Sequence, residues 1–185
     1  LVIILNFFAS VAMIWGQDNP SLLQMAVPSL NIAPDARGGG MGDMGAATLP
    51  DINSQYWNAA KYAFMGSKAG VSLSYTPWLR KLVNDVALVN MTGYYKLGNS
   101  DLQAISASLR YFSLGEVNIW ENIGDVPYGL NPYEMAFDVA YSRKLSESYS
   151  MAVTLRYIRS DMGTDQNDES NAGNAFSADI SGYLE

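Results

Sequence analysis

Side chains suited to catalysis or metal binding are scarce in this 185-residue sequence, which contains no His and no Cys. That composition excludes zinc fingers, thiol nucleophiles, Ser-His-Asp triads and imidazole-ligated metal sites. Asp161, Asp165, Asp168 and Glu169 could bind a cation, but their spacing matches no EF-hand and favours a solvated acidic loop. The other charged residues are predicted to form ion pairs with one another.

One such pair is fixed by a tight turn. A three-residue loop at Ser146-Glu147-Ser148 requires Leu145 to pair with Tyr149. Counting back in step from that pair places Asp138 opposite Arg156 on one face of the hairpin. Cross-strand neighbours have Cβ atoms about 4.5–5.5 Å apart, which allows a charge-assisted hydrogen bond.

Further charges can extend this pair into a ladder. Arg110 lies at a similar distance from the tight-turn end, on the chain segment before this hairpin. Asp179 lies on the segment after it. We interpret the ladder Arg110–Asp138–Arg156 as structural, because it keeps charges paired, and it could anchor the N-terminal part of the chain through Asp35 or Asp43. A binding site for a ligand carboxylate is the alternative.

The elements that carry these charges are predicted to be strands. Apolar and polar residues alternate in six stretches, at 69–78, 86–97, 102–114, 134–145, 149–161 and 174–185. At about 9–12 residues they have the length of tilted membrane strands. The alternation predicts one lipid-facing set, with the sequence neighbours of each member facing the opposite side: Val71, Met91, Leu109, Val139 and Leu155.

The connections between these stretches differ in length. Two are tight turns, at 98–100 and 146–148, whereas those at 79–85, 115–133 and 162–173 are long. Short turns at one end and long loops at the other are typical of an outer-membrane β-barrel, with the long loops outside the cell. A secreted β-sandwich is the alternative, but the second face here is mostly Ser, Thr, Ala and Asn. Six strands cannot close a membrane barrel, so we expect a fragment of a longer one.

Composition limits the partners. The net charge is −7, with 11 basic and 18 acidic residues, which argues against nucleic acid. Residues 1–16 are predicted to be a partial signal peptide, because residues 1–15 are apolar and uncharged. A short membrane anchor or a buried helix is the alternative for them.

Residues 17–66 are rich in Gly, Pro and Asp and precede the predicted strands at 67–185. They predict a hatch that folds into the barrel lumen. A disordered linker is the alternative, but Tyr56, Trp57, Tyr62 and Phe64 are many aromatic residues for one.

Several motifs are distinctive. The stretches PDARGGGMGDMGAAT (34–48), SQYWNAAKYAFM (54–65), SKAGVSLSYTPWLRKLVND (67–85) and ISASLRYFSLGEV (105–117) closely resemble the PorV family of outer-membrane proteins of the type IX secretion system. The resemblance runs from about residue 30 to about residue 160. It implies a FadL-like transmembrane antiparallel β-barrel, fourteen-stranded in full, with an N-terminal hatch.

The resemblance also implies a function. PorV-like proteins bind the C-terminal signal domain of secreted cargo and carry it from the translocon to a surface attachment complex with the sortase-like PorU. They are not enzymes, and no cofactor is implied. A FadL-like transporter of hydrophobic small molecules is the alternative, and the hatch-like segment disfavours a passive porin.

The candidate site residues follow from this function. Cargo approaches from outside, so the aromatic residues Trp120, Tyr128 and Tyr133 of the longest loop are candidate cargo contacts. Packing at the barrel mouth or in an aromatic girdle is the alternative for them. Asp35 and Arg37 of the hatch could touch cargo or a lipid-like ligand, but are more readily interpreted as pairing with lumen charges.

Overall fold

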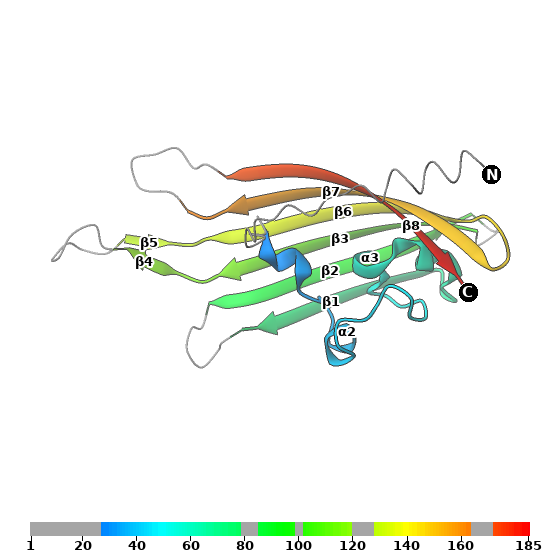
Figure 1. Ribbon diagram of the computed structural model, residues 1–185, viewed down its shortest axis with the longest axis horizontal. Helices are drawn as coiled ribbons and strands as arrows, with labels where there is room; N and C mark the ends of the chain where they lie inside the picture. The colour runs from blue at the N-terminus through cyan, green and yellow to red at the C-terminus, as the bar shows by residue number, and fades with distance from the viewer. Residues whose placement is uncertain (1–26, 79–84, 99–101, 120–127, 164–171) are drawn as a thin grey trace, which may run out of the picture.

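The fold is an antiparallel sheet with an irregular N-terminal segment across one face (Figure 1). The computed structural model describes residues 27–78, 85–98, 102–119, 128–163 and 172–185. The predicted signal peptide at 1–16 lies outside the described residues. Six strands form the sheet in the order β1-β2-β3-β6-β7-β8. They are β1 (Ala69–Pro77), β2 (Val86–Leu97), β3 (Gln103–Leu114), β6 (Tyr133–Lys144), β7 (Tyr149–Asp161) and β8 (Gly173–Leu184).

These strands confirm the six predicted stretches, with ends that differ by no more than one residue. One part of the prediction was wrong. The connection at 115–133 is not all loop, because β4 (Val117–Ile119) pairs with β5 (Tyr128–Leu130) as a separate two-stranded ribbon. Three-residue strands are too short to give a period-two pattern, so the sequence carried no signal for them. In Figure 1 this β4–β5 hairpin extends beyond the long-loop end of the sheet.

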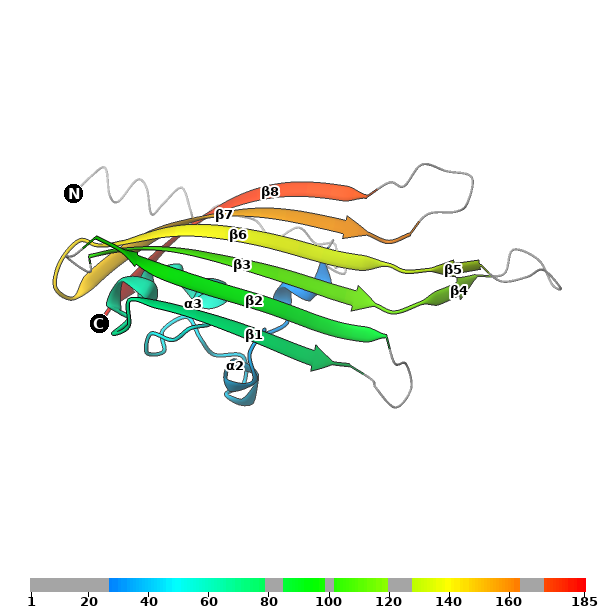
Figure 2. The same cartoon turned by 180° about the vertical axis from the view of Figure 1, so that it is seen from behind.

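The two faces of the sheet differ in composition. The outer face carries exposed apolar side chains, among them all five that were predicted to face lipid, and their exposed fractions run from 43% at Leu109 to 72% at Val71. Their sequence neighbours point to the inner face, where Thr92, Ser108 and Asp138 are buried. Figure 2 shows the outer face with the N-terminal segment behind it.

This distribution decides between the two fold classes. A β-sandwich would bury its apolar face against a second sheet, but in the described chain the other sheet is only the β4–β5 ribbon. A continuous exposed apolar surface of this kind marks a contact with lipid or another protein. The chain is therefore an all-β protein with the wall of a transmembrane β-barrel. The described sheet is open, with β1 and β8 at its edges.

The inner face is covered by the N-terminal segment, defined here as residues 27–66. It contains short helical turns at Pro28–Asn31 (η1), Ala36–Gly40 (α2), Ser54–Trp57 (α3) and Ala59–Phe64 (η2). Among the described residues, no helix has the length and apolarity needed to cross a membrane. Ala59, Ala60 and Tyr62 of η2 pack into a buried cluster with Tyr94 and other inner-face residues of the strands. This packing rules out the disordered-linker interpretation for residues 27–66.

Candidate functional site

The candidate site is the contact between the N-terminal segment and the inner face of the sheet. Its centre is Tyr62, which is fully buried and stacks on Tyr94 with ring centroids 4.9 Å apart. The Tyr62 hydroxyl donates to the Ile52 carbonyl at 2.8 Å and accepts from the Gln55 amide at 2.8 Å. Burial raises the pKa of the Tyr62 phenol to about 12, because the phenolate would lose its hydration. Tyr62 therefore stays neutral and holds α3 and η2 together.

Polar side chains attach the same region to the tight-turn end of the sheet. The Ser150 hydroxyl donates to the Ala60 carbonyl at 2.8 Å, and Asn58 Nδ2 donates to the Gly182 carbonyl at 2.9 Å. Ser106 of β3 donates to Gln55 Oε1. These bonds join η2 and α3 to strands β3, β7 and β8.

A second attachment lies toward the long-loop end, at Ser29. Glu134 Oε2 accepts from the Ser29 amide at 3.0 Å, and Arg110 Nη1 donates to the Ser29 carbonyl at 3.0 Å. Both side chains are buried, and the Arg110 guanidinium lies 4.4 Å from the centre of the Tyr56 ring. Glu134 and Arg110, on neighbouring strands, therefore bind the backbone amide and the backbone carbonyl of Ser29. We call this pair of contacts the Ser29 clamp. A buried charge is tolerated when it is paired and hydrogen-bonded.

The ion pair between Asp138 and Arg156 is present. The two residues are cross-strand partners, as the turn at 146–148 predicted, and Leu145 pairs with Tyr149. Arg156 Nε donates to Asp138 Oδ1 at 2.6 Å, and Arg156 Nη1 lies 3.8 Å from Asp179 Oδ2, so the predicted extension to Asp179 is also confirmed.

Arg110 is not a member of this ladder. The register places Ser108 opposite Asp138, where its hydroxyl donates to Oδ2 at 3.1 Å, and places Arg110 opposite Ala136. The prediction was wrong because the connection between β3 and β6 contains the β4–β5 ribbon, so the sequence did not set the register across it. Arg110 is part of the Ser29 clamp instead.

Asp35 and Arg37 make contacts within the N-terminal segment. Asp35 accepts from the Gly38 amide at 2.7 Å and from Trp57 Nε1 at 3.3 Å, whereas Arg37 pairs with Asp51 at 3.2 Å on the surface. In the described chain the clamp to the strands goes through Ser29, so the predicted anchor through Asp35 or Asp43 was wrong. The Asp35 carboxylate caps α2 and makes its hydrogen bonds within the N-terminal segment, not to a strand. Asp35 and Asp43 line a recess of about 480 Å³ between α2 and the end of β1.

Lys61 was missed by sequence reasoning. It is fully buried, and its Nζ donates to the Gly45 carbonyl at 2.7 Å and to Thr48 Oγ1 at 3.1 Å. Burial lowers the pKa of Lys61, since the charged form loses hydration. Lys61 therefore links the loop at Gly45–Thr48 to η2. Tyr62, Gln55 and Glu134 were also missed, although Glu134 carried a signal as the single Glu within the six long strands.

The three predicted loop aromatics have different positions. Trp120 lies outside the described residues. Tyr128 is the first residue of β5 and pairs with Ile119. Tyr133 is the first residue of β6 and stacks on Tyr111 of the outer face, with ring centroids 5.5 Å apart. Tyr133 therefore has the position of the girdle alternative, and the predicted cargo contacts are untested.

The acidic loop gives little support for a cation site. Asp161 accepts from the Gly163 amide at 3.1 Å. Asp165, Asp168 and Glu169 lie outside the described residues. Within the described ranges, no group of three or more His, Cys, Asp or Glu side chains is placed to hold a metal ion.

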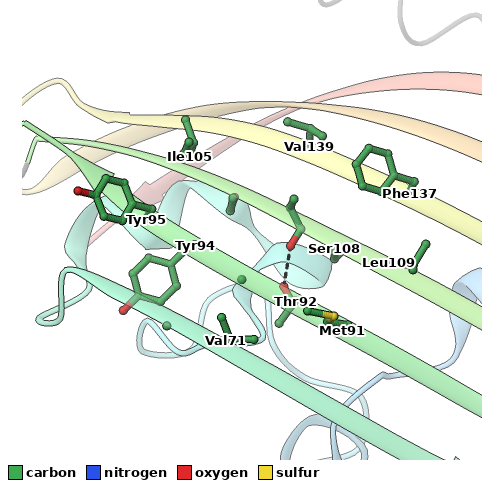
Figure 3. A pocket seen from close by; sticks show the side chains of 14 residues that line it. Val71, Met91, Thr92, Tyr94, Tyr95, Ile105, Ser108, Leu109, Phe137 and Val139 are labelled. Atoms are coloured by element: carbon green, nitrogen blue, oxygen red, sulfur yellow. Dashed lines mark hydrogen bonds between the residues drawn. The ribbon is translucent and has the colours of Figure 1, made fainter.

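The outer face has a shallow hollow of about 470 Å³ (Figure 3). It forms where Gly93 pairs with Ala107, because these small residues lie between the larger side chains of Val71 and Val139. The Thr92 hydroxyl beneath it donates to the Ala107 carbonyl at 3.4 Å. The hollow offers apolar contact but few polar groups to orient a ligand, so it is not a candidate cargo site.

Comparison with known families gives one match. The family model described as "Type IX secretion system protein PorV" matches residues 16–185. A search of curated proteins finds no match. The matched range covers most of the chain, including the N-terminal segment, the Ser29 clamp and all strands of the sheet. The chain therefore belongs to the PorV family, a family of outer-membrane components of the type IX secretion system.

Proposed function

We propose that this chain lies in the outer membrane, binds the C-terminal signal domain of secreted cargo as it leaves the translocon, and delivers it to a PorU-containing attachment complex. In this role it makes and breaks no covalent bonds. Membership of the PorV family carries the proposal. The exposed apolar outer face supports the membrane location.

The N-terminal segment supports the role of receptor over that of channel. We propose that it is a hatch, because its attachments at Ser29 and at η2 lie toward opposite ends of the inner face. Opening a path along that face would break buried hydrogen bonds to Glu134, Arg110 and Ser150. The inner face also buries many polar and charged side chains beside its apolar cluster, which does not suit a FadL-like route for hydrophobic molecules.

The β4–β5 hairpin is the proposed cargo contact. It projects beyond the long-loop end of the sheet (Figure 1), where a ligand outside the cell would arrive first. Trp120 and Tyr128 are its candidate anchors, since large aromatic residues dominate interface hot spots. Tyr133 is a less suitable candidate because it stacks on Tyr111.

A matched pair of substitutions tests this assignment. Tyr128→Ala should weaken binding of a purified signal domain about tenfold or more, because hot-spot residues contribute roughly 2 kcal/mol or more. Tyr133→Ala should leave that affinity within about twofold. Both proteins must keep the heat-modifiable gel mobility of a folded barrel. Equal losses in the two variants, or none in Tyr128→Ala and in a deletion of residues 119–130, would place cargo binding elsewhere.

A further inference from the structure

Near its long-loop end, the outer face carries a cation that has no ion-pair partner among the described residues. Arg159 of β7 lies in the same outward column as Val153, Leu155 and Tyr157, and its cross-strand partners are Met135 and Asn174. Its side chain is half-buried, and the guanidinium Nε is itself buried and has no hydrogen-bond acceptor in the described residues. A cation at the border of an apolar surface is stabilised by an anion or by water.

The described residues supply no such anion nearby. Asp161 follows two residues later on the same face, but its carboxylate accepts from the Gly163 amide, and no described acid lies within ion-pair distance of Arg159. Asn174, across from Arg159, accepts from the Tyr157 hydroxyl at 2.7 Å and donates to the Ala172 carbonyl at 3.2 Å. Arg159 therefore has no ion-pair partner among the described residues.

An apolar recess lies on the same face beyond Tyr157, on the side away from the long loops. It is a hollow of about 460 Å³ over the small residue Ala178, which we call the Ala178 hollow. Leu155 and Val139 line its middle, and Tyr157 and Phe176 close its upper edge with ring centroids 5.1 Å apart. The order from the long-loop end is therefore cation, aromatic pair and apolar hollow.

That order matches the chemistry of one class of ligand. An anionic headgroup would meet Arg159, while an acyl chain would enter the Ala178 hollow past the aromatic pair. Aromatic residues lie at the headgroup level of membranes, and basic residues at this level recognise anionic lipids. The volume of the hollow is within the range of small-molecule sites.

We propose that Arg159, Tyr157 and the Ala178 hollow form a binding site for one lipid with a phosphate headgroup of net negative charge, in the leaflet at the long-loop end. The site rests on the membrane placement proposed above but not on cargo binding. It would position the sheet in the membrane at β7, next to the connection that leads from β7 to β8.

Photolabelling of the purified full chain in non-ionic detergent tests the site. The probes are phosphatidylglycerol and phosphatidylcholine that carry the same photoactivatable acyl chain, and the readout is labelling of peptides from β6 to β8. Phosphatidylglycerol should label these peptides about tenfold more than phosphatidylcholine, because its headgroup has a net negative charge whereas the choline ammonium neutralises the phosphate of phosphatidylcholine. Excess inorganic phosphate should compete weakly, because it lacks the acyl chain.

The variants separate the site from general lipid contact. Arg159→Gln should reduce phosphatidylglycerol labelling about tenfold, whereas Arg159→Lys should keep most of it, and Ala178→Phe should reduce labelling by filling the hollow. Arg143→Gln is the control, because Arg143 is exposed on the same face at the tight-turn end. Equal labelling by both lipids, or an equal loss in Arg143→Gln, would overturn the proposal. Full competition by inorganic phosphate would overturn the lipid assignment, because it would show a simple anion site to which the acyl chain contributes nothing. None of these measurements involves cargo, so their failure is distinct from failure of the receptor function.

Discussion

Breaking the ion pair between Asp138 and Arg156 should have unequal effects from its two sides. In Arg156→Ala the Asp138 carboxylate, whose side chain is 9% exposed, keeps only the neutral Ser108 hydroxyl as a donor. An uncompensated buried charge costs about 3–5 kcal/mol. In Asp138→Ala, Arg156 is more exposed, at 20%, and still has Asp179 at 3.8 Å, so we expect a loss of about 1–3 kcal/mol.

Equilibrium unfolding in urea, followed by circular dichroism in detergent micelles, measures both losses. The double mutant should give a coupling energy of about 1–3 kcal/mol, as for residues in direct contact. The exposed pair Arg37–Asp51 is a matched control, because its Arg side chain is 53% exposed and its coupling should stay below about 1 kcal/mol. The charge-swapped pair Asp138→Arg/Arg156→Asp should recover part of the loss of either single swap. Coupling no larger than in the control would refute the reasoning.

Three further predictions follow from burial and spacing. Leu109→Arg on the outer face should destabilise the membrane-inserted protein by about 2–4 kcal/mol in the same unfolding assay, and a change below about 1 kcal/mol would contradict a membrane midplane position. Gly45→Ala should speed protease cleavage of the N-terminal segment, because the new Cβ overlaps the Trp57 ring, whereas Gly39→Ala, which meets no neighbour, should not. Raising the pH from 10 to 12 should remove about 2 kcal/mol of stability through Tyr62, because the unfolded chain loses the phenol proton above pH 10 whereas folded Tyr62 keeps it up to its pKa of about 12, and Tyr62→Phe should remove this part of the loss.

The strands were predictable because their pattern is local. Alternation alone assigned Leu109 and Val139 to the outer face, and the three-residue turn at 146–148 was enough to place Asp138 opposite Arg156. A tight turn leaves no freedom in the register of its hairpin. The long connection between β3 and β6 does leave such freedom, which is why Arg110 was assigned to the wrong partner.

The site was much less predictable. The N-terminal segment has no periodic pattern, so nothing in the sequence matched Ser29 to Glu134, or Ala60 to Ser150, across 105 and 90 residues. Lys61 is of a residue type that is almost never fully buried. Its burial depends on two oxygen acceptors that the Gly45–Thr48 loop provides only after it has folded.

The distances in sequence spanned by these contacts set an order of assembly. The bond from Asn58 to Gly182 joins residues 124 positions apart, so the N-terminal segment cannot complete its contacts until β8 is in place. The part of the segment at Ser29 depends in the same way on β3 and β6. Contacts of such long sequence separation form slowly, since the chain between them must first be ordered. The residues that leave the ribosome earliest are therefore among the last to reach their final positions, and until then the polar inner face remains open to water.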